Sequence, residues 1–145
     1  MVALQSTSCD LILQNHMQKN LRSQLYAVLF LLIILFIFNN IAAELSLYWI
    51  YRWFDLPMHF IGGALISWLA YIVYAWYRKD YNIPWIYAVV FSFGLGFIWE
   101  VMEFYYKVAQ LVPDYMLDST KDILVDMVGG LVVYLAWDKI SNKKI

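Results

Sequence analysis

A long uncharged apolar segment near the N-terminus constrains this chain more than any other feature of its sequence. Leu25–Ala43 follows the basic residues Lys19 and Arg22 and carries no charged side chain. It is close to the roughly 20 residues that a helix needs to cross about 30 Å of hydrocarbon, and it exceeds the roughly 7–15-residue core of a cleaved signal peptide. We therefore expect a retained first membrane span.

Three further segments have a similar length and character. They are Pro57–Trp76, Pro84–Tyr105 and Ser119–Trp137, the last of which is interrupted by Asp126. Overall, 63% of the 145 residues are hydrophobic and 14% are charged, which is too apolar for a soluble domain of this size. The loops between the segments are short, so neighbouring helices should run antiparallel. The sequence predicts an all-α integral membrane protein built as a four-helix bundle.

Basic residues are distributed unevenly between the two ends of this bundle. One end has seven of the ten lysines and arginines, and the other has only Arg52, Lys107 and Lys121. Under the positive-inside rule this asymmetry predicts that both termini are cytoplasmic. We expect two parts: a polar segment over residues 1–22, either lying on the membrane surface or disordered, and a transmembrane domain over residues 23–145.

Charge and cysteine content exclude several classes of function. The net charge is −1, which provides no basic surface for nucleic acid. The single Cys9 can form neither an internal disulfide nor a thiolate zinc site. The sequence also shows no nucleophile motif, nucleotide-binding loop or haem ligand pair. The number of subunits stays open.

Ionisable side chains recur at helical spacing near one end of three expected spans. They are Asp55 and His59 in the second span, Glu100 and Glu103 in the third, and Asp118, Asp122 and Asp126 in the fourth. Spacings of three and four residues place side chains on one face of a helix. Antiparallel helices that rise about 1.5 Å per residue bring these groups to the same depth. We expect them to meet near the non-cytoplasmic interface.

Several carboxylates inside a membrane need to be neutralised, because a charged Asp costs about 2.5–3.5 kcal/mol at the bilayer centre. A bound divalent cation would meet this need. The predicted metal ligands are Asp55, His59, Glu100, Glu103, Asp122 and Asp126. This set of carboxylates with one imidazole favours Mg²⁺, Mn²⁺, Ca²⁺ or iron over Zn²⁺. Within it, His59, Glu100 and Asp126 are the predicted catalytic residues.

Structural roles compete with this interpretation for some of these residues. Asp55 fits the N-cap region of the second span, and Ser119 with Asp122 three residues later fits a capping box for the fourth. Glu103 has Lys107 four residues further on, which fits an ion pair on one helix face. Glu100 and Asp126 lie furthest from a helix end and have no adjacent basic partner, so a structural role explains these two acids least well.

Three short motifs carry a family resemblance. They read Asp55-x-x-x-His59-Phe60-x-Gly62-Gly63, Trp99-Glu100-x-x-Glu103 and Asp122-x-x-x-Asp126-x-x-Gly129-Gly130. In this order they resemble the YjdF-type inner-membrane family and its VanZ-like relatives. The resemblance implies a polytopic protein of the plasma (inner) membrane of a prokaryote, with polar motifs that face one another. VanZ-like proteins are associated with glycopeptide-antibiotic resistance at the cell envelope, but their closing motif usually has Asn where this chain has Asp126, so the chain is closer to the YjdF type.

Three functions are compatible with these features. The first is a metal-dependent hydrolase or transferase that acts on a lipid or lipid-linked substrate at the outer leaflet. The second is a cation- or proton-translocating protein, and the third is a structural membrane protein whose acids only tie helices together. The inner halves of the spans offer mainly Ser67, Tyr74, Ser92 and Tyr134, without an ionisable acid or base at depth. This pattern favours a closed site over a conduit.

Overall fold

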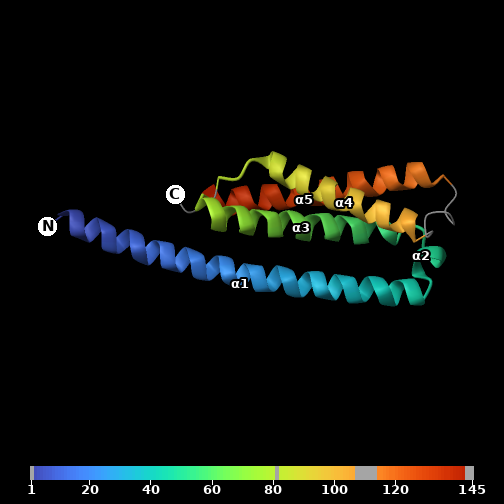
Figure 1. The fold of residues 1–145 in the computed structure, drawn as a ribbon, viewed down its shortest axis with the longest axis horizontal. Coiled ribbons are helices and arrows are strands. Elements are labelled where there is room, and N and C mark those ends of the chain that lie inside the picture. Colours follow the sequence, from blue (N-terminus) through green and yellow to red (C-terminus); the bar gives the residue numbers. More distant parts are fainter. Residues whose placement is uncertain (1, 81, 107–113, 143–145) are drawn as a thin grey trace.

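The computed structural model describes residues 2–80, 82–106 and 114–142, and the side chains of residues 2–17, 138 and 140–142 lie outside the description. Within these ranges the chain forms helices and no strand (Figure 1). The helices are α1 (Val2–Glu44), α2 (Leu47–Ile50), α3 (Asp55–Arg78), α4 (Trp85–Tyr105) and α5 (Tyr115–Asn142). The prediction of an all-α protein is therefore confirmed.

Three of these helices are long and apolar enough to cross a membrane. They are Gln18–Glu44, Asp55–Arg78 and Trp85–Tyr105. The first two contain the first two expected spans, and the third matches the expected span Pro84–Tyr105 except that Pro84 is its N-cap residue. The fourth expected span lies within α5, which is not among these three helices, and charged residues lie in both its first half and its last turns. The described ranges hold five helices where four were expected, because the loop after the first span contains the single turn α2.

The N-terminal segment continues directly into the first span. The backbone is helical from Val2 to Glu44 without a break near residue 22, where the sequence analysis divided the chain. The division of the chain at residue 22, with residues 1–22 either lying on the membrane surface or disordered, stays a prediction.

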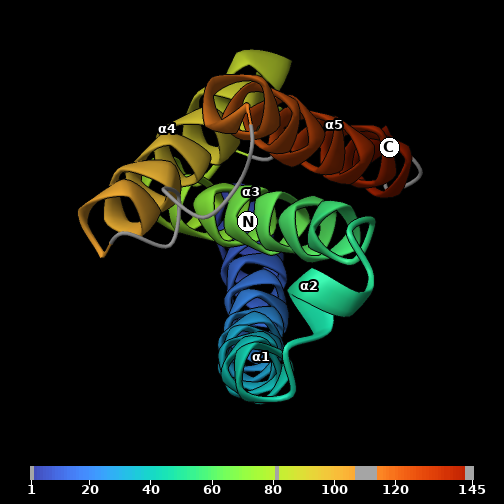
Figure 2. The same ribbon diagram turned by 90° about the vertical axis from the view of Figure 1, so that its right-hand side faces the viewer.

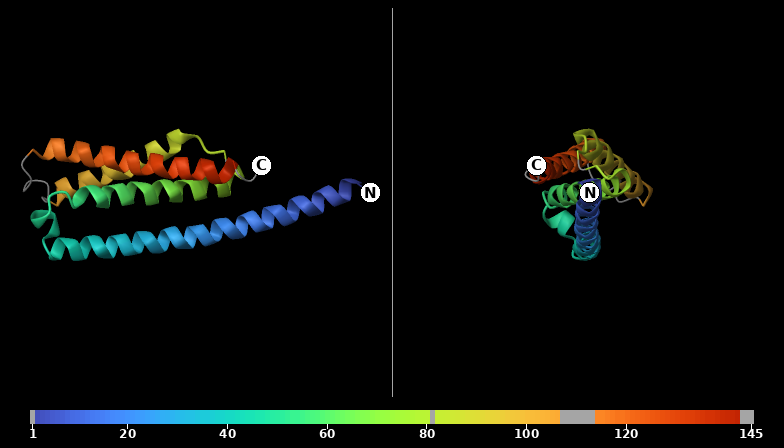
Figure 3. Two further views of the ribbon diagram at one scale, coloured as in Figure 1. Left: turned by 180° about the vertical axis from the view of Figure 1, so that it is seen from behind. Right: turned by 90° about the vertical axis from the view of Figure 1, so that its left-hand side faces the viewer.

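Helix α3 is the centre of the arrangement. It packs against α1, α4 and α5, and α5 packs along both α3 and α4, whereas α1 packs mainly against α3 (Figure 2). The start of α1 and the end of α5 lie at one end of the bundle, and the end of α1, the start of α3, the end of α4 and the start of α5 lie at the other (Figures 1 and 3). The long helices therefore alternate in direction, as the short loops predict.

Glycines allow the close approach of α3 and α5. A Cβ atom on Gly63 would lie 2.6 Å from the Cα of Asp126, and one on Gly129 would lie 3.0 Å from the backbone nitrogen of Ala64. A Cβ on Gly130 would likewise lie 2.7 Å from a serine hydroxyl of α4. Small residues permit such tight packing between helices in a membrane. This packing holds the acids of α5 against α3 and α4.

The apolar core lies toward the termini, away from most of the acids. Tyr71 and Ala88 are fully buried, and the Tyr71 ring packs edge-on against Trp137 with centroids 5.6 Å apart. The hydroxyls of Ser67 and Ser92 both donate hydrogen bonds to the carbonyl of Ala88, at 3.0 and 2.6 Å. The backbone thus satisfies these two serine hydroxyls, whereas the buried Tyr71 hydroxyl has no hydrogen-bond partner among the described residues.

Helix α1 is held to α3 by polar contacts just before its apolar segment Leu25–Ala43. The indole nitrogen of Trp68 donates to Oε1 of Gln24 at 3.2 Å, and the guanidinium of Arg22 lies 5.8 Å from the ring centroid of Trp76. Val28, one turn further along, is fully buried. Many apolar side chains on the remaining faces of α1 are exposed, as expected of a helix that meets lipid.

Substituting Trp68→Phe should weaken the attachment of α1 by removing the only donor in the Trp68–Gln24 hydrogen bond. Hydrogen bonds between membrane helices contribute about 0.6 kcal/mol on average and about 1.7 kcal/mol at most. We expect a loss of this size in the free energy of unfolding, measured by denaturation of the detergent-solubilised protein in SDS. Trp85→Phe, at an exposed indole on α4, is the matched control. Equal losses in both variants would show that the hydrogen bond contributes nothing.

Candidate metal centre

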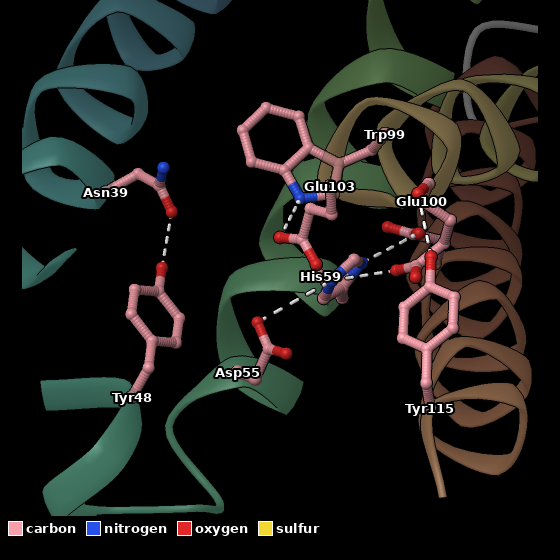
Figure 4. A network of polar contacts seen from close by, with 9 residues as sticks. Asn39, Tyr48, Asp55, His59, Trp99, Glu100, Glu103 and Tyr115 are labelled. Atoms are coloured by element: carbon pink, nitrogen blue, oxygen red, sulfur yellow. Dashed lines mark hydrogen bonds and ion pairs between the residues drawn. The ribbon is translucent and has the colours of Figure 1, made fainter. Parts of the chain in front are cut away.

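Acidic side chains from three helices meet around His59, at the end of the bundle opposite the termini (Figure 4). Nε2 of His59 lies 3.6 Å from Oδ1 of Asp55 and 3.7 Å from Oε1 of Glu100. Nδ1 of His59 lies 3.0 Å from Oδ2 of Asp126. The structure thus brings together residues that are up to 71 positions apart in the sequence, as the helical spacing predicts.

The two ring nitrogens of His59 have different surroundings. The contact from Nδ1 to Asp126 has hydrogen-bond length. The contacts from Nε2 to Asp55 and Glu100 are too long for hydrogen bonds, which fall at about 2.7–3.2 Å. In the neutral ring, Nδ1–H donates to Asp126 and Nε2 keeps its lone pair. That lone pair faces the other carboxylates.

Asp55, His59 and Asp122 can share one cation. One ligand atom from each lies within 4.8 Å of the other two, and His59 and Asp122 are buried. Metal–oxygen distances of about 2.0–2.6 Å place ligand atoms on opposite sides of an ion about 4–5 Å apart. The spacing of these three side chains therefore fits the coordination shell of one divalent cation.

Glu100 supplies a second, independent sign of a ligand. The residue is 6% exposed, and its Oε1 has no hydrogen-bond partner among the described residues. Its backbone carbonyl, by contrast, accepts a hydrogen bond from the Tyr115 hydroxyl at 2.8 Å. A buried carboxylate oxygen without a partner is costly. This oxygen points toward His59, where a cation would satisfy it (Figure 4).

Glu103 and Asp118 lie at the edge of the cluster. Oε1 of Glu103 accepts a hydrogen bond from the Trp99 indole at 2.9 Å (Figure 4). The side chain of Asp118 is 38% exposed and lies 3.7 Å from the ammonium of Lys121. The ion pair expected between Glu103 and Lys107 lies outside the described residues. These two acids are already partnered by the protein.

The structure changes the expected capping roles. Helix α5 begins at Tyr115, four residues before Ser119, so the capping box predicted from Ser119 and Asp122 is wrong. Asp55 is the first residue of α3 and follows the N-cap residue Phe54, which has no capping side chain. A carboxylate in the first turn still interacts favourably with the helix dipole. An interaction with the helix dipole does not prevent the Asp55 carboxylate from binding a metal.

A cavity of about 710 Å³ opens in front of these carboxylates. Its lining includes Asn39 of α1, Tyr48 of α2 and Tyr115 of α5, none of which the sequence analysis assigned to the site. The Tyr48 hydroxyl donates a hydrogen bond to Oδ1 of Asn39 (Figure 4). Burial, together with the negative charges of Asp55 and Glu103, raises the pKa of Tyr48 above its usual range, so this hydroxyl stays protonated.

One sequence signal could have identified Asn39. It stands with a second amide, Asn40, inside the last turns of an otherwise apolar segment. A polar side chain at membrane depth indicates a polar neighbour. Tyr48 offered no such signal, because an aromatic residue beside a span is also typical of an interfacial anchor.

Comparison with known proteins places the chain in a family. The profile of the family described as "Predicted membrane protein (DUF2238)" matches residues 2–143. Searches of curated proteins and of solved structures gave no match. The expected resemblance to the YjdF type is confirmed, since the YjdF type is this family, while the relation to VanZ-like proteins stays a prediction. With the matched region covering nearly the whole sequence, the chain belongs to the DUF2238 family of predicted membrane proteins.

Proposed function

We propose that this chain is a membrane-embedded hydrolase or transferase that depends on a divalent metal and acts on a lipid or lipid-linked substrate. One observation carries the proposal. Nε2 of His59 faces Asp55 and Glu100 at distances too long for hydrogen bonds, and the facing oxygen of Glu100 is buried without a hydrogen-bond partner in the described structure. A shared cation explains both facts.

The proposed site residues divide into two groups by their contacts. We assign four residues as ligands: one ligand atom each of Asp55, His59 and Asp122 lies within 4.8 Å of the other two. Oε1 of Glu100 lies 3.7 Å from Nε2 of His59. Asp126 and Glu103 are hydrogen-bonded to His59 and Trp99, so we assign them to positioning the site. Carboxylates with one imidazole suit Mg²⁺, Mn²⁺, Ca²⁺ or iron better than Zn²⁺. When bound, such an ion polarises a substrate oxygen and lowers the pKa of a bound water.

The bundle geometry supports a fourth crossing by α5. Its 28 residues extend about 42 Å at 1.5 Å per residue, which is enough to span a bilayer. Asp122 and Asp126 are buried against the other helices, while Leu124, Val128 and Leu135 are exposed where lipid would lie. We propose four crossings with both termini in the cytoplasm, and a site near the outer face of the plasma membrane of a prokaryote.

The packing beside the site favours a closed centre over a translocation pathway. The contact of α3 with α5 at Gly63 and Gly129 leaves no room for a side chain between the backbones. Toward the termini, the serine hydroxyls are engaged by the carbonyl of Ala88. A purely structural role would require partners for the acids, yet Lys121 with Asp118 is the one pair between a lysine or arginine and a carboxylate in the described part of the chain.

Elemental analysis of the detergent-purified protein tests the proposal. We expect a stoichiometric divalent metal in the parent protein and its loss in a Glu100→Gln, Asp122→Asn double variant, which keeps the side-chain shapes. Glu44→Gln, at an exposed acid at the end of α1, should retain the metal. Circular dichroism checks that all three proteins have the same helix content. The metal found would then be used to assay hydrolysis of lipids in mixed micelles.

If no metal copurifies and none binds on titration with Mg²⁺, Mn²⁺, Ca²⁺, Fe²⁺ or Zn²⁺, the metal-dependent function is wrong. A protonated His59 paired with the surrounding carboxylates would then account for the cluster, and the structural role would be preferred.

A further inference from the structure

A second cavity, of about 230 Å³, lies between α1, α3 and α4. Its walls are mostly aliphatic or aromatic and include Leu32, Leu35, Phe36, Met58, Ile66 and Leu95. Phe36 and Leu95 are also partly exposed on the surface where lipid would lie. The cavity, called the apolar groove below, is therefore suited to a hydrocarbon chain that enters sideways from the bilayer.

The apolar groove ends at the candidate metal centre. Its lining also includes His59 and Asp126, and it shares Asn39, Asp55 and Trp99 with the larger polar cavity. The two cavities therefore adjoin. Toward the termini, α1 and α3 are tied together by the hydrogen bond between Trp68 and Gln24. A molecule that fills both cavities must have a polar end at the carboxylates and an apolar end between α1 and α4.

Charge in the polar cavity indicates the chemistry of the polar end. Arg52 is the one basic residue among the described residues that line it, and five acids line the same cavity. Once a divalent cation offsets the carboxylates, Arg52 and the cation are the two positive groups that face the space. A guanidinium binds phosphate oxygens in a paired, charge-assisted geometry. A phosphate between Arg52 and the metal centre would contact both of these positive groups.

We infer that one phosphate-bearing membrane lipid occupies both cavities, with an acyl chain in the apolar groove and its headgroup phosphate beside Arg52. This inference rests on the proposed function for the cation, and it names the substrate class of that site. The polar cavity, at about 710 Å³, lies within the roughly 300–1,000 Å³ typical of ligand sites.

Photo-crosslinking in phosphate-free maltoside micelles tests this inference. Two probes carry the same diazirine-bearing acyl chain, one with a phosphatidic acid headgroup and one as the neutral diacylglycerol. Mass spectrometry maps the labelled residues on the full chain. We expect the phosphatidic acid probe to label the groove segments around Leu35 and Leu95 at least fivefold more than the neutral probe does. Millimolar inorganic phosphate should not displace it, because the acyl chain contributes to binding.

Two variants separate the chain from the headgroup. Gly62→Leu extends a side chain into the groove, since a Cβ there meets only Leu35 Cδ2 at 4.0 Å and Asp126 Oδ1 at 3.9 Å. It should reduce labelling at least fivefold. Gly94→Leu is the matched control, because a Cβ there meets nothing within 4 Å and the residue does not line the groove. Arg52→Gln, at an exposed residue, should abolish the preference for the phosphate probe without affecting folding.

Equal labelling by both probes in every variant, or labelling spread over all lipid-exposed faces, would overturn the inference. Displacement by inorganic phosphate would also overturn it, in favour of a free phosphate ligand. Metal content, measured in the same samples, separates the two proposals. If labelling depends on Arg52 but the protein holds no metal, the result supports the lipid site and contradicts the metal-dependent enzyme. If metal is bound but labelling is unspecific, the result supports the metal site and contradicts the lipid inference.

Discussion

Replacing Asp126 by asparagine is expected to weaken divalent-metal binding by roughly 10- to 100-fold, the usual effect of losing a partner that orients a ligand. Oδ2 of Asp126 lies 3.0 Å from Nδ1 of His59. A carboxylate can only accept there, so the ring proton stays on Nδ1 and the Nε2 lone pair is free for a metal. An amide can donate to Nδ1 instead, which moves the proton to Nε2 and removes that lone pair.

Calorimetric titration of the detergent-purified variant with the metal found in the parent measures this effect. Asp118→Asn is the matched control, because it makes the same change of charge on the same helix. Its carboxylate is 38% exposed and pairs with Lys121 at 3.7 Å, and exposed ion pairs contribute only about 0–1 kcal/mol. Asp118→Asn should therefore bind the metal like the parent. Unchanged affinity in Asp126→Asn, or an equal loss in both variants, would contradict the orienting role.

The sequence was sufficient to predict that acids of three helices converge, although two of the expected acids, Glu103 and Asp118, lie at the edge of the cluster. A helix repeats every 3.6 residues and short loops make neighbouring helices antiparallel, so residue number translates into depth and face. This reasoning correctly places Asp55, Glu100 and Asp126 around His59. It depends only on local periodicity and connection length, both of which can be read without tertiary coordinates.

The same reasoning could not predict which acids are hydrogen-bonded to other side chains and which keep an oxygen without a partner. Asp126 and Glu100 have equally apolar sequence surroundings, yet one is hydrogen-bonded to His59 Nδ1 and the other leaves an oxygen without a hydrogen-bond partner in the described structure. Side-chain direction across helices decides this difference. The start of α5 was also missed, because the chain turns at Asp114, where a φ of 60° is unusual for a residue other than glycine.

Substituting Gly63→Leu is expected to separate α3 from α5 and destabilise the protein by about 3 kcal/mol, the upper end of overpacking effects and roughly a hundredfold change in the ratio of folded to unfolded protein. A Cβ at Gly63 would lie 2.6 Å from the Cα and 2.7 Å from the carbonyl carbon of Asp126. These are backbone atoms within a helix, so they cannot move aside as the end of a flexible side chain can. SDS denaturation followed by circular dichroism measures the loss.

The control variant Gly94→Leu distinguishes crowding at Gly63 from a general effect of placing leucine in a helix. At Gly94 a Cβ meets nothing within 4 Å, and leucine there replaces a residue that costs about 1 kcal/mol in a helix, so Gly94→Leu should be neutral or stabilising. Since Asp126 is the residue that Gly63 contacts, separating the helices also carries its carboxylate away from His59. Metal binding should therefore fall with stability in Gly63→Leu and persist in Gly94→Leu. A Gly63→Leu protein as stable as the parent would show that α3 and α5 are not in backbone contact.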